Sequence, residues 1–303
     1  MEQIRVTLAC GIELDVVDTG PRDAPVLVFL HGFPESHRTW RHQIAHLSGR
    51  FRCIAPDQRG YRGSSKPQNV ESYTPDKLIG DVFQLADALG VGKFTIVGHD
   101  WGGAIAWGVA LMGQMNGRVN RAVIANAPHP VGFARLVWTN RHQRESSQYM
   151  RTFRDTSNDA LVRELGLGGI LLKAFGDRLA TGDRMEPEER AALTSEWANV
   201  DAAFGMLNWY RASPLYVPAM DEPYAVPAEG GPPDLPPLTL PTLVVWALDD
   251  IALPPENLDG LEAMVPNLEV VKVSDCGHFV PWEAPQAVNA AMDAFLTRTA
   301  TDA

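Results

Sequence analysis

The segment Gly98-His-Asp-Trp-Gly102 places a carboxylate at a turn where it could do chemistry. The apolar residues 93–97 before it predict a short buried strand, and residues 103–110 after it predict a helix. Gly98 and Gly102 permit a sharp turn between the two, because a side chain at either position would crowd the packing beneath it. Asp100 would lie at the tip of that turn as a nucleophile, or it would simply cap the helix.

A turn of this kind carries serine in the nucleophile elbow, written G-x-S-x-G, of hydrolases that attack acyl carbons. A carboxylate is poorly suited to that attack, because the product would be an anhydride. It suits displacement at a saturated carbon, which yields an alkyl ester of the enzyme. Asp100 therefore favours substrates with a carbon–halogen bond or with a strained carbon–oxygen bond such as that of an epoxide.

An ester on the nucleophile must be cleared by water, and that water needs a base. In hydrolases with this turn, the nucleophile is followed along the chain by an acid and then by a histidine. His278 follows the last predicted strand and is the expected base. Asp249 and Asp250 follow the strand before it, and Trp246, four positions earlier, favours Asp250 as the acid that orients the histidine. The slot after an earlier strand, where some such hydrolases carry the acid, holds the uncharged Asn126.

Two backbone groups are expected to form an oxyanion hole beside Asp100. His31-Gly-Phe-Pro34 closes the third predicted strand, and the backbone N–H of Phe33 would pair with that of Trp101. An oxyanion forms when water attacks the carbonyl of the ester, so these donors belong to the second step. The substrate pocket is expected to include His31, Pro34, Trp101 and Trp209.

The leaving group separates the two substrate classes. A halide departs without a proton, whereas an epoxide oxygen leaves as an alkoxide whose conjugate acid is about as weak as water, with a pKa of ~15.7. A tyrosine with a pKa of ~10 can donate that proton. Tyr149 and Tyr210 are candidate proton donors, and the alternative is that both are ordinary aromatic residues of amphipathic helices.

The elements around these residues predict an α/β protein. Short apolar runs alternate with helical patterns, which is typical of a mostly parallel sheet with helices on both faces. After a hairpin at residues 3–20, the predicted strands are residues 25–30, 51–55, 93–97, 121–125, 242–246 and 268–273. The predicted helices are residues 38–47, 76–89, 103–110 and 285–296.

The alternation stops in the middle of the chain. Residues 131–241 carry helical patterns but no convincing strand, and nine prolines between Pro214 and Pro241 suit an irregular return path. We therefore expect residues 1–130 and 242–303 to form one core, with residues 131–241 inserted as a helical lid over the C-terminal ends of the strands. The lid aromatics that suggest an apolar pocket are Trp138, Phe153, Phe175, Trp197, Phe204 and Trp209.

Composition narrows the function classes. A hydrophobic content of 45% predicts a globular protein with a large core, and a net charge of −11 argues against nucleic acid or an anionic membrane as a partner. The basic residues at positions 141–154 are expected to form a solvated helix face. The N-terminal residues lack a signal-peptide pattern and no apolar run is long enough to span a bilayer, so we expect a cytoplasmic protein.

No metal or organic cofactor is expected. Three cysteines at Cys10, Cys53 and Cys276 give neither a disulfide framework nor the spacing of a metal site. His42 and His46 would share a helix face, but two histidines without a third ligand make a weak metal site. The oligomeric state, including a homodimer, is left open by the sequence.

Several segments together resemble the soluble type of α/β-hydrolase-fold epoxide hydrolases. The segments are His31-Gly-Phe-Pro34, Gly98-His-Asp-Trp-Gly-Gly103, Leu207-Asn-Trp-Tyr-Arg211 and the late aspartate and histidine. The resemblance spans nearly the whole chain and implies the α/β-hydrolase fold with an inserted helical lid. One departure is Ala247-Leu248, where the family often has a glycine or an acidic residue.

The resemblance implies that a small apolar epoxide is opened to a vicinal diol without a cofactor. In that family an aspartate forms an alkyl-enzyme ester, a His–Asp pair activates water, and two lid tyrosines bind and protonate the epoxide oxygen. Carried over by motif, these roles fall on Asp100, on His278 with Asp250, and on Tyr149 with Tyr210. The match at Tyr149 rests on Tyr-x-x-x-Phe and on its position in the lid.

Two alternatives come from other function classes. Haloalkane dehalogenases share the fold, the aspartate and the tryptophan after it, but many have an asparagine where this chain has Phe33. A non-catalytic ligand-binding member of the fold is the second alternative. Its weakness is that a binding protein has no need of both His278 and Asp250.

Overall fold

The computed structural model describes residues 3–175, 185–228 and 231–300. In these ranges, no helix is long and apolar enough to cross a membrane. The strands are β1 (Gln3–Thr7), β2 (Glu13–Thr19), β3 (Val26–Leu30), β4 (Arg52–Pro56), β5 (Phe94–His99), β6 (Val119–Ala125), β7 (Thr242–Ala247) and β8 (Leu268–Val273). They form one sheet in the order β1-β2-β4-β3-β5-β6-β7-β8, in which β1 and β2 are antiparallel and β3 to β8 run parallel.

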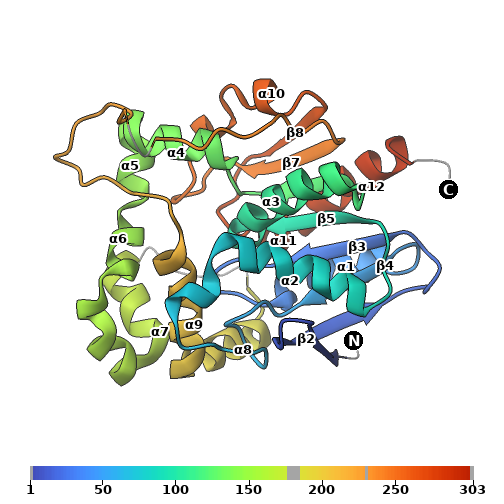
Figure 1. The fold of residues 1–303 in the computed structure, drawn as a ribbon, viewed down its shortest axis with the longest axis horizontal. Helices are drawn as coiled ribbons and strands as arrows, with labels where there is room; N and C mark the ends of the chain where they lie inside the picture. Colours follow the sequence, from blue (N-terminus) through green and yellow to red (C-terminus); the bar gives the residue numbers. More distant parts are fainter. Residues whose placement is uncertain (1–2, 176–184, 229–230, 301–303) are drawn as a thin grey trace.

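Helices cover both faces of this sheet (Figure 1). One face packs against α1 (Arg41–Leu47), α11 (Val280–Glu283) and α12 (Pro285–Arg298), and the other against α2 (Pro75–Ala88) and α3 (Asp100–Asn116). Short helices η1 (His37–Trp40), η2 (Val70–Tyr73), η5 (Pro255–Leu258) and α10 (Leu261–Met264) lie in the connections. The predicted α/β architecture is therefore confirmed.

The β3 sequence Val-Leu-Val-Phe-Leu shows why its strand is apolar at every position. Leu27 and Phe29 belong to the hydrophobic cluster of α1 and α12, whereas Val28 and Leu30 belong to the cluster of α2 and α3. Successive side chains of a strand point to opposite faces, so a strand covered on both sides needs no polar alternation. The strands β5 and β7 are likewise buried at every position, and β6 lies between them in the sheet.

Between β6 and β7 the chain forms the predicted helical lid. Its helices are α4 (Pro130–Thr139), α5 (Arg141–Ser146), α6 (Gln148–Arg154), the short η3 (Thr156–Asn158), α7 (Asp159–Phe175), α8 (Pro187–Trp197) and α9 (Val200–Ala212). Figure 1 shows α6 to α9 gathered at one end of the sheet, away from the C-terminus. The described part of residues 131–241 contains no strand. The lid therefore adds side chains to the site without extending the sheet.

The basic residues at positions 141–154 form the predicted solvated face only in part, because Arg141 and Arg151 are exposed whereas Arg144 and Arg154 are not. Arg144 is fully buried and donates hydrogen bonds to backbone carbonyls of Val137, Trp138 and Glu222, among others. Arg154 donates to the carbonyl of Tyr210 at 2.8 Å. A guanidinium presents five N–H donors, so these side chains tie the proline-rich return path to the lid helices. The expectation was wrong for Arg144 and Arg154, because they also bind carbonyls of distant segments, such as those of Glu222 and Tyr210.

Candidate active site

The turn between β5 and α3 has the geometry that its glycines permit. Asp100 is the first residue of α3 and has φ of 50°, in the left-handed region that other residues than glycine rarely adopt. Such a conformation costs about 1–3 kcal/mol and is typical of functional sites. A Cβ atom at Gly98 would lie 2.5 Å from the Gly102 carbonyl oxygen, and one at Gly102 would lie 2.3 Å from that of His31. Both glycines are therefore needed for the turn to close.

The loop after β3, residues 31–35 and called the β3 loop below, holds one oxygen of Asp100. The backbone N–H of Phe33 donates to Asp100 Oδ1 at 2.6 Å. This approach depends on Gly32, because a Cβ atom there would lie 2.4 Å from the Cβ atom of Asp100. The ring of His31 also stabilises the loop, since its Nδ1 lies 2.9 Å from the carbonyl oxygen of Gly32. The β3 loop thus leaves Asp100 Oδ2 as the second, less constrained oxygen.

The second predicted oxyanion donor is the backbone N–H of Trp101. It lies in the first turn of α3, where backbone N–H groups have no partner within the helix. In the part of the chain that the structure describes, no hydrogen bond joins this N–H to Asp100. Its role therefore stays a prediction.

His278 lies between two carboxylates. Its Nδ1 is 2.7 Å from Asp250 Oδ2, and its Nε2 is 3.4 Å from Asp100 Oδ2. The three side chains come from loops that follow β8, β7 and β5, at the C-terminal end of the parallel strands. Asp250 rather than the exposed Asp249 makes the contact, and its other oxygen accepts the backbone N–H groups two and three residues further on, at 2.8 and 3.0 Å.

Asn126 supports the acid from the end of β6. Its Nδ2 donates to Asp250 Oδ2 at 2.8 Å, and its Oδ1 accepts the backbone N–H of Ala247 at 2.8 Å. The side chain of Asp250 is fully buried, so each of these hydrogen bonds satisfies a polar atom that water does not reach. The sequence identified Asn126 only as an uncharged residue, because spacing along the chain does not show which strands are neighbours.

The charges at the site favour a protonated His278 beside an ionised Asp100. Burial alone would lower the pKa of His278, but Asp250 and Asp100 outweigh it and raise that pKa well above its usual value. Burial alone would raise the pKa of Asp100, but the hydrogen bond and charge of His278 hold it below its usual value. Asp100 is therefore ionised at neutral pH, as a nucleophile must be.

A buried pair beneath the histidine was not found from the sequence. His99 Nδ1 lies 3.1 Å from Glu35 Oε2, and His99 Nε2 lies 2.9 Å from the carbonyl oxygen of His278. The other oxygen of Glu35 accepts the indole N–H of Trp282 at 2.8 Å. The pair fixes the backbone of His278 from the core side. Glu35 directly follows the segment His31-Gly-Phe-Pro34, and His99 directly precedes Asp100. This proximity to the two motifs is the signal by which the sequence could have indicated the pair.

A cavity of about 510 Å³, part of it open to solvent, lies against Asp100. Core and lid both contribute to its wall, which consists of Phe33, Pro34, Asp100, Tyr149, Phe175, Tyr210, Ile251, Ala252, His278 and Phe279. Tyr149 comes from α6 and Tyr210 from α9, and their ring centroids lie 6.0 Å apart. Burial raises the pKa of both phenols above the usual value for tyrosine, so both stay protonated and able to donate.

The structure brings only one of the predicted pocket residues into the wall of this cavity. Pro34 lines it, whereas the ring of His31 is fully buried and Trp209 donates its indole N–H to the Arg59 carbonyl. Trp101 is not part of this wall, and its ring packs against that of Tyr210 with centroids 5.1 Å apart. Of the lid aromatics that suggested an apolar pocket, Phe175 alone belongs to this wall, and Trp138, Phe153, Trp197, Phe204 and Trp209 pack elsewhere. The sequence placed aromatic residues in the lid correctly but could not say which way they point.

Known proteins resemble this chain over most of its length. The family described as alpha/beta hydrolase fold matches residues 25–285. Epoxide hydrolase 1 of Caenorhabditis elegans is 29% identical over 297 residues, which are 95% of this chain and 68% of that protein.

Solved structures are similar as well. One, described as a novel epoxide hydrolase of the alpha/beta hydrolases superfamily from metagenomes from hot environments, is 69% identical with a TM-score of 0.94, over 98% of both chains. The epoxide hydrolase of Bacillus megaterium in complex with an inhibitor is 32% identical with a TM-score of 0.83, over 98% of this chain and 100% of that one.

Proposed function

The chain belongs to the alpha/beta hydrolase fold family and is an epoxide hydrolase, and from this premise we propose that Asp100 is its nucleophile. The observation that carries the proposal is the position of this carboxylate. One oxygen is held by the backbone of Phe33, the other lies beside His278, and two protonated phenols line the same cavity. An ionised nucleophile and proton donors at one cavity are what opening an epoxide requires.

In the first step Asp100 Oδ2 attacks the less hindered carbon of the epoxide. A bond forms between that oxygen and the carbon while the carbon–oxygen bond of the ring breaks. The departing oxygen takes a proton from Tyr149 or Tyr210, which hold it by hydrogen bonds. The packing of the lid supports this role, because the ring of Tyr210 contacts those of Trp101 and Tyr149, with centroids 5.1 and 6.0 Å apart, so both phenols lie at the same cavity.

In the second step His278 deprotonates a water that attacks the ester carbonyl. Formation of the ester makes His278 able to act as this base. The charge of Asp100 is one of the causes that raise the pKa of His278, and the ester is neutral, so that pKa falls once the ester exists. Asp250 keeps the ring oriented, and the Phe33 N–H, with that of Trp101 as the predicted second donor, stabilises the oxyanion. The proton that His278 releases when the ester forms restores the phenol that protonated the epoxide oxygen. After attack by water the tetrahedral intermediate breaks its bond to the ester oxygen, which takes the proton of the hydroxyl that water added to the carbonyl carbon. The products are the diol and free, ionised Asp100, with His278 again protonated by the proton that it took from water.

Dehalogenation with the same nucleophile is not favoured. A halide site needs N–H donors that reach the ion, whereas the side chain of Trp101, the indole next to the nucleophile, is not part of the cavity wall. The cavity wall carries phenols, which a departing halide does not need. A non-catalytic binding protein would have no use for the charge arrangement around His278.

The proposed substrate is a small epoxide with an apolar substituent. The side chains of Phe33, Phe175, Ile251 and Phe279 give the cavity apolar walls around the reacting groups. The cytoplasmic location that the sequence predicts remains a prediction, and the sequence leaves the oligomeric state, including a homodimer, open.

A single turnover in water enriched in heavy oxygen tests the covalent route. With enzyme in excess over styrene oxide, we expect the first diol to contain no heavy oxygen, because its new hydroxyl oxygen comes from Asp100. The enzyme should gain one labelled oxygen in the peptide that contains Asp100, measured by mass spectrometry. A labelled diol together with an unlabelled enzyme would mean direct addition of water and would overturn the proposal.

Replacement of Tyr210 by phenylalanine should slow ester formation about 10²-fold, because a proton donor in the transition state contributes at least this much. The rate is measured by rapid quench and mass spectrometry of the ester. The matched control is Tyr216→Phe, since Tyr216 is a half-exposed lid tyrosine whose hydroxyl contacts Glu222 outside the cavity. An unchanged rate of ester formation in Tyr210→Phe would remove this phenol from the proposed role.

A further inference from the structure

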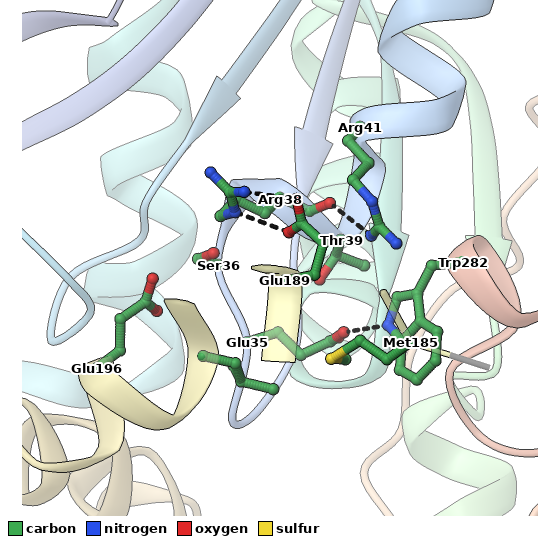
Figure 2. A pocket seen from close by; sticks show the side chains of 10 residues that line it. Glu35, Ser36, Arg38, Thr39, Arg41, Met185, Glu189, Glu196 and Trp282 are labelled. Carbon is green, nitrogen blue, oxygen red and sulfur yellow. Dashed lines mark hydrogen bonds and ion pairs between the residues drawn. The ribbon is translucent and has the colours of Figure 1, made fainter. Parts of the chain in front are cut away.

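Lid helix α8 is attached to the core by charges rather than by an apolar face. It buries none of its residues completely. Arg38 of η1 forms a two-point ion pair with Glu189, in which Arg38 Nε lies 2.8 Å from Glu189 Oε2. Nearby, Arg62 lies 2.8 Å from Glu196. Figure 2 shows the fork of Arg38 facing Glu189 across the crevice between core and lid.

The end of α8 reaches the β3 loop. The indole N–H of Trp197 donates to the carbonyl oxygen of Pro34 at 2.9 Å. Trp197 is itself seated by α7, which departs from helical geometry at Gly166, where a Cβ atom would lie 2.5 Å from the Trp197 carbonyl oxygen. This hydrogen bond therefore connects the lid to the backbone one residue beyond Phe33, whose N–H holds Asp100.

We propose that Trp197 is a positioning residue for the breakdown of the ester. The ion pairs of α8 hold its indole on the Pro34 carbonyl, and this contact fixes the Phe33 N–H against Asp100 Oδ1. The inference rests on the proposed function, because it assigns Trp197 a part in the second step of that mechanism. The lid then acts on the hydrolysis of the intermediate as well as on the binding of the epoxide.

The Phe33 donor affects the two steps differently. In the free enzyme it stabilises the Asp100 carboxylate, so a looser donor leaves the nucleophile at least as reactive in the first step. In the second step, negative charge develops on the same oxygen, and the donor is worth most when it is already in place. A displaced Phe33 N–H should therefore slow ester hydrolysis and spare ester formation.

Other lid contacts act on the side chain of Phe33 rather than on its backbone. The rings of Phe153 and Tyr210 pack on the Phe33 ring with centroids 5.2 and 5.0 Å apart. They hold the ring of Phe33 but make no hydrogen bond to the peptide groups of the β3 loop. The hydrogen bond of Trp197 to Pro34 is the contact that restrains those peptide groups from the lid side.

The test compares Trp197→Phe with Trp138→Phe, which removes an indole from lid helix α4 instead. Ester formation and ester hydrolysis are measured separately by rapid quench and mass spectrometry with styrene oxide. We expect Trp197→Phe to slow ester hydrolysis about tenfold, a fraction of the effect of losing an oxyanion donor outright. Ester formation should stay within about twofold, so kcat and KM fall together, and Trp138→Phe should leave both steps unchanged. Equal slowing of both steps, or of neither, would overturn the proposal.

A second pair of variants tests the ion pairs without touching the indole. Arg38→Glu removes the attraction to Glu189, and Arg38→Glu combined with Glu189→Arg restores it with the charges exchanged. We expect the single variant to slow ester hydrolysis selectively and the exchanged pair to recover most of the rate. Arg5→Gln, which removes ion pairs to Glu13 and Asp15 on the β1–β2 hairpin, is the control. Selective slowing that the exchanged pair does not relieve would contradict the proposal.

Failure of this inference can be told apart from failure of the proposed function. If no ester forms in the unmodified enzyme, the covalent mechanism is wrong. If the ester forms and Trp197→Phe hydrolyses it at the normal rate, the mechanism stands and the assignment of Trp197 is wrong.

Discussion

We expect Asp100→Asn to lower the kcat for an epoxide at least about 10⁴-fold, which is the size of the effect of losing a catalytic nucleophile. The amide keeps the shape of the carboxylate and still accepts the Phe33 N–H, so the fold should be unchanged. The same substitution should lower the pKa of His278. Burial already lowers that pKa, and the negative charge of Asp100 is one of the causes that raise it. Diol formation and NMR titration of the histidine ring measure the two effects.

Asp249→Asn is the matched control for this substitution. Asp249 lies next to Asp250 in the same loop, but its side chain is exposed. We expect its activity within about twofold of the unmodified enzyme, the range of a surface substitution. An intact mass must confirm that the new amide at position 100 has not been hydrolysed back to aspartate. Substantial turnover by an enzyme that still carries the amide would remove Asp100 from the reaction.

His278→Gln should stop the cycle after its first step. Glutamine can still hydrogen-bond Asp250 but cannot take a proton from water at neutral pH, so ester hydrolysis should fall about 10³-fold. Because attack by Asp100 does not need this base, the ester should accumulate. The intact mass of the protein should then increase by the mass of one substrate molecule. Rapid quench followed by peptide mapping locates the added mass.

The control for this variant is His46→Gln. His46 is a partly exposed histidine that pairs with Asp293 on the far side of the core, and its loss should leave both steps unchanged. If His278→Gln is inactive and carries no adduct while its fold is intact, the histidine is needed before ester formation. The two-step assignment would then be wrong.

Much of the fold could be predicted because its strands are short and apolar. The runs that form β3, β5 and β7 stand out from the amphipathic helices between them, and the glycines around Asp100 mark the turn without ambiguity. These signals are local. The clash that a Cβ atom would meet at Gly102 involves a carbonyl of the neighbouring strand, yet the need for glycine is visible within five residues of sequence.

The missed features depend on contacts between distant segments. Asn126 reaches Asp250 only because β6 and β7 are neighbours, and Trp197 reaches Pro34 across 163 positions of the chain. Arg144 looked like a surface residue because the carbonyls that it binds belong to the return path of the lid. The sequence could not indicate which lid aromatics line the cavity, for a similar reason. An aromatic residue on a lid helix can face the cavity or the lid interior, and the helical periodicity of the sequence does not determine which of the two it faces.

The charged attachment of α8 has a consequence for the conditions under which this enzyme works. The desolvation free energy of ionised groups becomes less unfavourable as the temperature rises. Ion pairs such as that of Arg38 with Glu189 are therefore weakened less by heating than a hydrophobic contact would be. Dissolved electrolyte acts in the opposite sense, because mobile ions shield partly exposed charges. We therefore expect the lid to stay attached over the cavity best in warm solutions of low ionic strength. At high salt concentration, α8 should be the first part of the lid to detach from the core.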